Sequence, residues 1–311
     1  MNILVTGGAG FIASHVVDAY INAGHHVVVV DDLSSGSTDN LHPKAEFVHL
    51  DIRKKEISDV FRRTPFDVVN HHAAQMDVRR SVDDPQFDAS VNVLGGLNVF
   101  EAARSAGVNK IIFSSTGGAI YGEQDEFPAT EEHPMRPLSP YGITKLSTEK
   151  YLFYYKEVHG IEHVILRYAN IYGPRQNPHG EAGVVAIFAK RMLEGGIPII
   201  NGDGKQTRDY VYVGDVVRAN VLALTCKTSS IFNIGTGLET DVNHLFLTLR
   251  EWLNPACPET HGPAKAGEQK RSVISSEKIK RELGWAPAVG LSEGLRLTAE
   301  FFKNKFVRHA P

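Results

Sequence analysis

The sequence has few cysteines, no long apolar run and no excess of positive charge, and each absence limits what the protein can be. Its two cysteines, Cys226 and Cys257, belong to no CxxC motif, which disfavours a disulfide framework or a zinc site and indicates a reducing cytoplasm. Apolar runs such as Val27–Val30 are far too short for a membrane-spanning helix. The net charge of -3 provides no positive field for nucleic acid or anionic lipid. We therefore expect a cytoplasmic protein that binds neither nucleic acid nor membrane.

Metal-binding motifs are also absent, although histidine is plentiful. The 14 histidines include the pairs His25-His26 and His71-His72, which lie in strand contexts. None of them belongs to an HExxH motif or to another spacing typical of metal ligands. We predict packing or surface roles for these histidines and no metal site.

Short apolar runs alternate with helical patterns through the first half of the chain. The runs that read as strands are 3–5, 26–30, 47–50, 66–70, 110–115 and 163–168. Being apolar on both faces, they are typical of a buried parallel sheet. Helical patterns at Phe11–Ala23, Pro85–Ala106 and Pro140–Val158 lie between them. This alternation predicts right-handed crossovers and an α/β, doubly wound parallel sheet.

A glycine-rich turn, "VTGGAGFIAS", follows the first strand directly and opens a helix. Gly7, Gly10 and Ala13 give a G-x-x-G-x-x-A spacing: Gly7 allows a tight turn, Gly10 lets backbone N–H groups approach a pyrophosphate, and Ala13 allows close helix packing. A merely tight turn is the alternative reading. The preceding strand and the following helix favour a dinucleotide site.

Acidic residues end the second and third strands. Asp31 or Asp32 lies about 20 residues beyond the glycines, where a carboxylate can accept hydrogen bonds from an adenosine ribose and repel a 2'-phosphate. The alternative reading of this acid is a plain helix cap. Asp51 and Ile52, at the end of the third strand, could flank the adenine. These positions predict NAD, in preference to NADP, as the cofactor.

The stretch "SPYGITK" places Tyr141 and Lys145 one helical turn apart, behind the N-cap Ser139. An ordinary surface pair is the alternative, but "FSSTGG" ends the preceding strand with a hydroxyl cluster at the same sheet edge. Lowering the tyrosine pKa from ~10 by about 3 units needs roughly 4 kcal/mol, which a lysine ammonium and a nicotinamide cation can supply. Tyr141 could then take a proton from a substrate hydroxyl that Thr116 orients, while hydride passes to NAD.

With these residues identified, the chain resembles the extended short-chain dehydrogenase/reductase family, and within it the NAD-dependent epimerases of the UDP-glucose 4-epimerase kind. The resemblance rests on "TGGAGFIAS", "DDLSSG", "HHAAQ", "VNVLGGLNV", "FSSTGGAIYGE", "SPYGITK", "LRYANIYGPRQ", "NGDGKQTRDYVYV", "FNIGTG" and "RELGW", and it runs essentially from end to end. It implies 4-epimerisation of a UDP-hexose, UDP-glucose and UDP-galactose above all, through a transient 4-ketone with NAD kept bound.

The resemblance also implies a role for each matching position. The catalytic residues would be Thr116, Tyr141 and Lys145. The cofactor would contact Gly7, Gly10, Phe11, Ile12, Asp31, Asp32, Ser34, Ser35, Gly36, Asp51, Ile52, Ala73, Ala74, Gln75, Asn92, Ser114, Ser115, Tyr141, Lys145 and Tyr168. The UDP-sugar would contact Thr116, Tyr141, Asn170, Gly183, Val184, Val185, Ile199, Asn201, Gln206, Arg208, Lys265, Glu268 and Ser272. Arg208 would face the diphosphate, unless it forms a structural ion pair with Asp209 or Asp215.

Domain boundaries follow from the same reading. After about residue 171, glycine and proline become frequent and the strand pattern loosens. We predict a Rossmann-type NAD-binding domain over 1–170 with about 208–236, and a smaller α/β C-terminal lobe for the nucleotide sugar over 171–207 and 237–311. The family pairs helices equivalent to 85–106 and 140–158 across a two-fold axis, which implies a homodimer.

Several positions depart from the family pattern. Thr116 sits in "STGG" where the family often has "SSSA", which leaves Ser115 as the alternative catalytic hydroxyl. Asn201 replaces an aromatic residue near the uracil, and Lys265 and Glu268 replace an arginine and an aspartate that hold the nucleotide. Ser272 replaces a residue that is bulky in some relatives, so we predict that UDP-N-acetylglucosamine is accepted too.

Two other functions remain open at this point. A uronate epimerase or decarboxylase of the same fold could use Arg79-Arg80 for a substrate carboxylate, whereas Gly117-Gly118 after Thr116 disfavours a dehydratase. A non-catalytic NAD-binding regulator would have no need of Tyr141 and Lys145 together.

Overall fold

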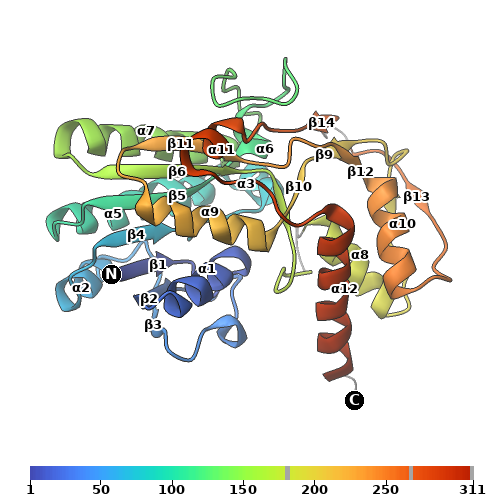
Figure 1. Cartoon of the computed structure of the whole chain (residues 1–311), viewed down its shortest axis with the longest axis horizontal. Coiled ribbons are helices and arrows are strands. Elements are labelled where there is room, and N and C mark those ends of the chain that lie inside the picture. Colours follow the sequence, from blue (N-terminus) through green and yellow to red (C-terminus); the bar gives the residue numbers. More distant parts are fainter. Residues whose placement is uncertain (179–182, 266–268, 309–311) are drawn as a thin grey trace.

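A seven-stranded parallel sheet forms the centre of the molecule in the computed structural model, which describes residues 1–178, 183–265 and 269–308 (Figure 1). Its strands are β1 (Asn2–Thr6), β2 (His26–Asp31), β3 (Glu46–His49), β4 (Val68–His71), β5 (Lys110–Thr116), β6 (Glu162–Tyr168) and β11 (Ser230–Ile234). Their order is β11-β6-β5-β4-β1-β2-β3, and every neighbouring pair is parallel. The predicted doubly wound, Rossmann-type sheet is confirmed.

Helices cover both faces of this sheet. On one face, α1 (Phe11–Asn22) and α9 (Val213–Thr225) bury Val16, Val17 and Val216 against Ile3 and Val5. On the other face lie α2 (Ile57–Arg63), α5 (Gly96–Ser105) and α7 (Pro140–His159), which pack against the alternate residues of the same strands (Figure 1). Burial on both faces explains why the strands read as continuous apolar runs.

The helical pattern at 85–106 is not one continuous helix. Three elements share it: α4 (Pro85–Ala89), the π-helical segment η2 (Ser90–Gly95) and α5. A further helix, α3 (Val78–Asp83), precedes them. A Cβ on Gly95 would lie 2.9 Å from Ile52 Cδ1, so the wide turn brings backbone close to the end of the third strand. This position of the turn is next to the predicted cofactor site.

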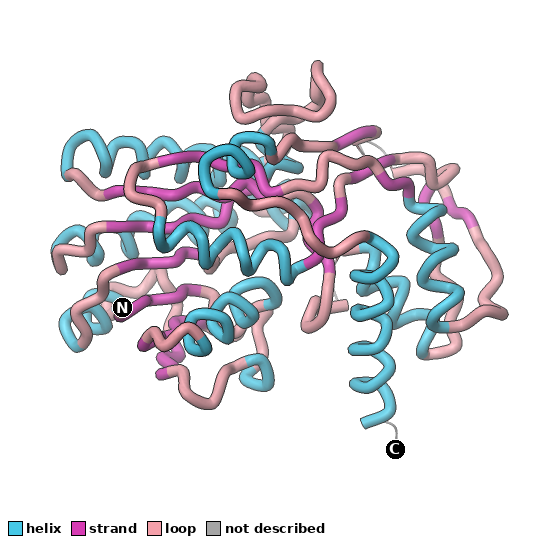
Figure 2. The backbone as a smooth tube through the Cα atoms, in the orientation of Figure 1, coloured by secondary structure: helices cyan, strands magenta, loops and turns pink. Residues whose placement is uncertain are grey.

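A second lobe lies beyond the carboxyl ends of the strands (Figures 1 and 2). It contains α8 (Val184–Leu193), α10 (Val242–Leu253) and α12 (Leu291–Arg308), which share a core around Phe188, Phe246 and Leu295. Its short strands are β8 (Ile200–Asn201), β9 (Thr207–Arg208), β12 (Thr240–Asp241), β13 (His261–Gly262) and β14 (Arg271–Ser272). The chain returns to the central sheet between these parts, through α9 and β11. The remaining short elements are η1 (Thr38–Asn40), between β2 and β3, α6 (Gly117–Ile120), between β5 and α7, and then β7 (Asn170–Tyr172), β10 (Tyr210–Tyr212) and α11 (Glu277–Leu283).

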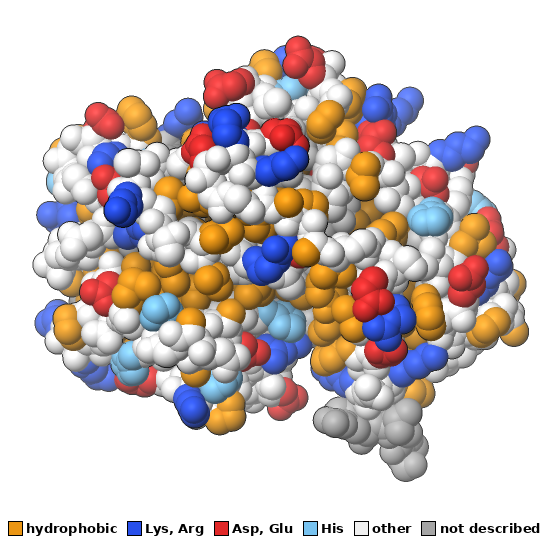
Figure 3. All heavy atoms as spheres, viewed as in Figure 1, with side chains coloured by type: hydrophobic (Ala, Val, Ile, Leu, Met, Phe, Trp, Pro, Cys, Tyr) orange, Lys and Arg blue, Asp and Glu red, His pale blue; other side chains and the backbone are white. Residues whose placement is uncertain are grey.

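The visible surface mixes charges of both signs over one face of the molecule (Figure 3). Within the described residues, no helix is both long enough and apolar enough to cross a membrane.

Candidate active site

The glycine turn after β1 leaves room for a ligand at the start of α1. Gly7 has φ +72° and its N–H donates to the Val30 carbonyl at 2.7 Å; a Cβ there would lie 2.7 Å from the backbone nitrogen of Ala73. Gly10 is the N-cap of α1, and neither a side-chain cap nor an acidic residue occupies the first turn. Phe11 and Ile12 then begin the helix. The positive helix end is therefore open to an anion.

Asp31 holds this turn in place from the end of β2. Its carboxylate is 7% exposed and accepts from the Ala9 N–H at 3.0 Å and the Leu33 N–H at 2.8 Å. Burial raises the pKa of Asp31, and these two hydrogen bonds oppose the shift. Each oxygen retains acceptor capacity for a further donor such as a ribose hydroxyl.

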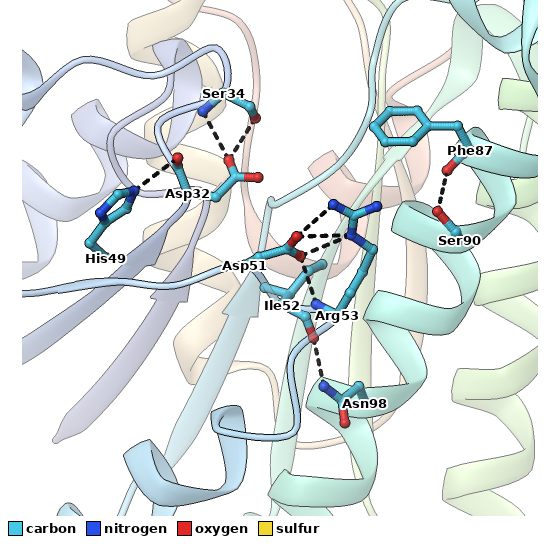
Figure 4. A network of polar contacts seen from close by, with 9 residues as sticks. All are labelled: Asp32, Ser34, His49, Asp51, Ile52, Arg53, Phe87, Ser90 and Asn98. Carbon is cyan, nitrogen blue, oxygen red and sulfur yellow. Dashed lines mark hydrogen bonds and ion pairs between the residues drawn. The ribbon is translucent and has the colours of Figure 1, made fainter.

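Asp32 lies on the solvent side of the same turn. Its carboxylate accepts from both the N–H and the hydroxyl of Ser34 (Figure 4). Ser35 is exposed, and a Cβ on Gly36 would lie 2.9 Å from the Ala9 carbonyl carbon, so the turn closes against the glycine loop. The structure thus gives Asp31 and Asp32 different surroundings. The sequence alone could not tell which of the two faces the glycine turn.

Asp51 forms a two-pronged ion pair with Arg53 at the end of β3 (Figure 4). The Arg53 Nη2–Asp51 Oδ2 distance is 2.6 Å, and hydrogen bonding to Arg53 lowers the pKa of Asp51. The Arg53 guanidinium also lies 5.3 Å from the centroid of the Phe87 ring. Ile52 is buried under η2, where its carbonyl accepts from Asn98 Nδ2 at 2.7 Å. Arg53 was not among the predicted residues.

Asn92 clamps the loop that follows β4. Its Oδ1 accepts from the Gln75 N–H at 2.8 Å, and its Nδ2 donates to the Gln75 carbonyl at 3.0 Å. The Ala73 N–H donates to Thr6 Oγ1 at 3.2 Å, and Ala74 lies half-buried between these anchors. The predicted wall of residues 73–75 therefore has a fixed backbone beside the glycine turn.

Tyr141, Lys145 and Thr116 meet where β5 ends and α7 begins. The Thr116 side chain lies close enough to the Tyr141 hydroxyl to favour its ionised form, and the Tyr141 N–H donates to the buried Ser81 hydroxyl at 3.2 Å. Lys145 Nζ donates to the Ser114 carbonyl at 2.8 Å and lies 5.9 Å from the centroid of the Tyr141 ring. Ser139 caps the helix through the Gly142 N–H, as predicted.

Ser115 points to a different environment from Thr116. Its hydroxyl donates to Glu149 Oε1 at 2.5 Å, and Glu149 forms a buried ion pair with Arg167 at 2.7 Å. Arg167 Nη1 also donates to the Tyr121 hydroxyl. Ser115 is therefore committed to a buried network, which leaves Thr116 as the hydroxyl beside Tyr141.

Burial dominates the electrostatics of the tyrosine–lysine pair. It lowers the pKa of Lys145 to about 8, while the charges of Asp88 and Glu149 act in the opposite direction. Burial, followed by the charge of Asp88, raises the pKa of Tyr141, and the Thr116 hydrogen bond opposes that shift. The sequence predicted a lowered Tyr141 pKa from Lys145, and the structure gives the opposite direction. The prediction failed because the sequence reveals neither the burial of the tyrosine nor the nearby carboxylate.

Tyr168, which we predicted to contact the cofactor, is buried. Its hydroxyl accepts from Asn220 Nδ2 at 2.9 Å, inside a buried network with Asn70 and Tyr20. Its contact with the cofactor stays a prediction.

The predicted substrate residues line two parts of the second lobe and its junction with the sheet. Asn170 is exposed at the start of β7, and its Oδ1 and Thr116 Oγ1 both lie within 4 Å of the position a Cβ on Gly118 would take. Gly183 caps α8 without a side-chain cap, followed by Val184 and Val185. Glu268 lies outside the described residues.

The remaining substrate candidates cluster around the short strands. Arg208 on β9 is in register with Ser272 on β14, and Gln206 Nε2 donates to the Asn201 carbonyl at 3.3 Å. Ser272 is buried, whereas Ile199 and Lys265 are exposed. The two proposed structural partners of Arg208 have other contacts. Asp209 accepts from Thr236 and Gly237, and Asp215 pairs with Arg218 at 2.7 Å.

A buried carboxylate, Asp88, is the main site residue that sequence reasoning missed. It is 0% exposed and accepts from Gln75, Asn92 and Thr144. An acid in a helical pattern reads as surface, so only its proximity to "VNV" and to Thr144 in "SPYGITK" could have indicated its role. Among the described residues, no group of three His, Cys, Asp or Glu side chains could hold a metal ion.

The arrangement can bind a dinucleotide across the carboxyl edge of the sheet and move a proton at Tyr141. Comparisons with known proteins agree with this geometry. The model of the NAD dependent epimerase/dehydratase family matches residues 3–235. The chain is 45% identical to UDP-glucose 4-epimerase of Mycolicibacterium smegmatis, over 98% of this chain and 99% of the relative.

Two solved structures are similar over nearly the whole chain. One is UDP-glucose 4-epimerase of Thermotoga maritima with UDP-glucose, with TM-score 0.96, 50% identity, and coverage of 98% of this chain and 99% of that one. The other is UDP-glucose 4-epimerase of Thermus thermophilus in complex with NAD, with TM-score 0.93, 45% identity, and coverage of 97% and 99%. The chain belongs to the NAD dependent epimerase/dehydratase family.

Proposed function

We propose that this protein is an NAD-dependent isomerase that converts UDP-glucose and UDP-galactose into one another by epimerisation at C4. The observation that carries this function is the meeting of Tyr141, Lys145 and Thr116 beside the open glycine turn. Similarity to UDP-glucose 4-epimerases at 45–50% identity over nearly the full length supports the choice of reaction and of substrate.

The residues around the glycine turn fit NAD. Gly7 has no space for a Cβ, the start of α1 is uncapped, and Asp31 retains acceptor capacity toward a ribose. When bound, NAD⁺ supplies a hydride acceptor and a positive charge beside the tyrosine. Burial raises the pKa of Tyr141. The positive charge of bound NAD⁺ and the Lys145 ammonium counteract this shift, because both favour the phenolate.

The chain's own groups then handle the proton. As phenolate, Tyr141 accepts the proton of the sugar C4 hydroxyl while the C4 hydrogen leaves as hydride, which produces a 4-ketone. Thr116 orients the C4 oxygen of the sugar toward Tyr141 through a hydrogen bond. Return of hydride to the opposite face, with the proton from Tyr141, yields the epimer and restores the starting state.

The substrate lobe supports this chemistry by holding the nucleotide. The uncapped start of α8 and the Arg208 side chain can bind a diphosphate by charge and hydrogen bonds. Asn170, exposed next to Thr116, can reach the sugar. A firmly held UDP and a loosely held hexose allow the ketone to present either face.

We also propose that the protein is a homodimer and that it is located in the cytoplasm. Exposed apolar side chains form one stripe along α7, at Ile143, Tyr151, Tyr154 and Val158, and Leu94 of the neighbouring η2 is also exposed. Such a surface favours pairing with a second copy across a two-fold axis. Both cysteines are buried free thiols, which suits a reducing compartment.

An NMR time course of the purified protein with UDP-glucose, without added reductant, tests the function. We expect UDP-galactose to accumulate to an equilibrium mixture. The variant Tyr141→Phe should lose at least about 100-fold in turnover, because it removes the proton acceptor, and should still bind NAD. Bound NAD with no epimer from any UDP-hexose would leave a binding protein and refute the epimerase.

A further inference from the structure

Asp88 is a carboxylate buried beneath the tyrosine–lysine pair, and the epimerase chemistry described above does not use it. It lies in α4, which packs directly against α7, and its side chain is fully buried. A carboxylate out of water is costly unless hydrogen bonds or a positive charge compensate for the lost hydration. The surroundings of Asp88 therefore indicate why this charge is kept.

Neutral donors surround the carboxylate. Oδ1 accepts from Gln75 Nε2 at 2.8 Å and from Asn92 Nδ2 at 3.1 Å, and Oδ2 accepts from Thr144 Oγ1 at 2.7 Å. Thr144 lies between Tyr141 and Lys145 in α7, and its hydroxyl is also 3.0 Å from the Tyr141 carbonyl. The carboxylate is thus fixed in position, and hydrogen bonding connects it to the helix that carries both catalytic side chains.

The titratable groups near Asp88 come from three elements. From α7, Lys145 is the cation that Asp88 influences, while the charge of Glu149 is matched by Arg167 at 2.7 Å. At the end of β4, burial lowers the pKa of both His71 and His72 to about 3, so these histidines are neutral.

The third element is α3, whose charged groups face outward. Its Arg80 guanidinium lies over the Phe87 ring, and the side chain of its N-cap Asp77 accepts from the Arg80 N–H. Within the described residues, Asp88 is therefore the carboxylate that balances Lys145 without being matched by an arginine.

We propose that Asp88 is a positioning residue of the active site, whose fixed negative charge balances the Lys145 ammonium and opposes a phenolate on Tyr141. This inference rests on the proposed function, because it assigns a role in the same proton transfer. The carboxylate keeps Lys145 charged in a site where burial favours the neutral amine. It also keeps the proton on Tyr141 until a positive charge binds next to it.

Asp88→Asn removes this charge while preserving the hydrogen bonds. The new Oδ1 can accept from Gln75 and Asn92, and the new Nδ2 can donate to Thr144 Oγ1, whose own proton can turn to the Tyr141 carbonyl. Both active-site pKa values should fall, since removal of a negative charge favours phenolate over phenol and amine over ammonium. We expect both limbs of the pH profile of kcat to move toward lower pH, by about one unit.

A matched control removes the same charge one turn earlier. Asp84 is the exposed N-cap of α4 and accepts from the Phe87 N–H, a role that asparagine retains. Asp84→Asn should leave the pH profile in place. If Asp88→Asn lowers kcat at every pH without moving either limb, Asp88 is only structural and the proposal is overturned.

A direct titration separates this inference from the proposed function. The ultraviolet absorbance of phenolate, taken as the difference from Tyr141→Phe in the same background, reports ionisation of Tyr141 whether or not the protein is an epimerase. In Asp88→Asn it should appear at lower pH than in the natural chain, and an unmoved titration would refute the charge role.

A second variant covers the case in which Asp88→Asn does not fold. Thr144→Val keeps the carboxylate but removes its Oδ2 donor, so its negative field at Tyr141 is less screened. We expect the phenolate to appear at higher pH, opposite in sign to the effect of Asp88→Asn. A shift to lower pH would contradict the proposal.

Discussion

Adjacent hydroxyls at the end of β5 have different partners, and both partners belong to α7. Ser115 donates to Glu149, whereas Thr116 lies beside the Tyr141 hydroxyl and accepts from the Ala119 N–H at 3.2 Å. Alternation along a strand sends neighbouring side chains to opposite faces, but the sequence does not tell which face the tyrosine approaches. Because Ser115 is held by Glu149, we favour Thr116 as the hydroxyl that works with Tyr141.

Ser272 is the residue for which we predict a change of substrate range. It is buried on β14 next to Arg208, and its carbonyl accepts from the Asp209 N–H at 2.9 Å. Ser272→Tyr adds a ring to a wall that we expect near the C2 substituent of the sugar. Turnover of UDP-N-acetylglucosamine should fall at least about ten-fold more than that of UDP-glucose, measured by NMR on each sugar alone.

Ser272→Ala is the control, because it keeps the small volume, and both activities should persist. Equal losses on the two sugars in Ser272→Tyr would show that the ring disturbs the lobe and not the acetyl pocket.

Elements were predictable from the sequence wherever one physical signal dominated. Apolar runs located the sheet because both of its faces are buried, and Ser139 located the start of α7 through its cap. The π-helical turn at Ser90–Gly95 was missed, because one extra residue in a turn leaves the apolar periodicity almost unchanged. Asp88 was missed for a related reason: a buried carboxylate and a surface carboxylate look alike in a helical pattern.

His71, at the carboxyl end of β4, should make the stability of the fold depend on pH. His71 is 1% exposed, its Nδ1 lies 2.7 Å from Thr6 Oγ1, and burial lowers its pKa from 6.5 to about 3. Because the folded pKa is depressed, this histidine contributes stability above pH 6.5, which is lost progressively as pH falls toward 3. At about pH 5 the loss should be about 2 kcal/mol, since the unfolded histidine binds a proton that the folded one does not.

Denaturant unfolding of the natural chain and of His71→Gln, at neutral pH and at about pH 5, measures this effect. At neutral pH the glutamine variant should have the lower free energy of unfolding. On acidification to about pH 5, it should lose about 2 kcal/mol less of that free energy than the natural chain does. His244→Gln, which changes an exposed histidine, provides the comparison. A parallel loss in His71→Gln and the natural chain would mean that His71 does not carry the acid sensitivity.

At the scale of the whole molecule, the candidate site lies on the side of the sheet that faces the second lobe. The strands end toward the second lobe (Figure 1). Thr116 is the last residue of β5, and Tyr141 and Lys145 lie near the start of α7, so all three lie on that side of the sheet. The helices α5 and α7 lie on a face of the sheet, so their outer surfaces are available to another chain without blocking the candidate site. This arrangement allows assembly and catalysis to use different surfaces of the same helix.

The assembly prediction follows from the outer surface of α7. Leu94→Asp combined with Val158→Asp puts two charges into an apolar surface that we expect to be buried between two copies. Light scattering should give the mass of two chains for the natural protein and of one chain for the double variant. Leu247→Asp, at an exposed apolar residue of α10, should leave the mass unchanged. A double variant that keeps the mass of two chains would place the interface elsewhere, and a natural protein with the mass of one chain would refute the homodimer.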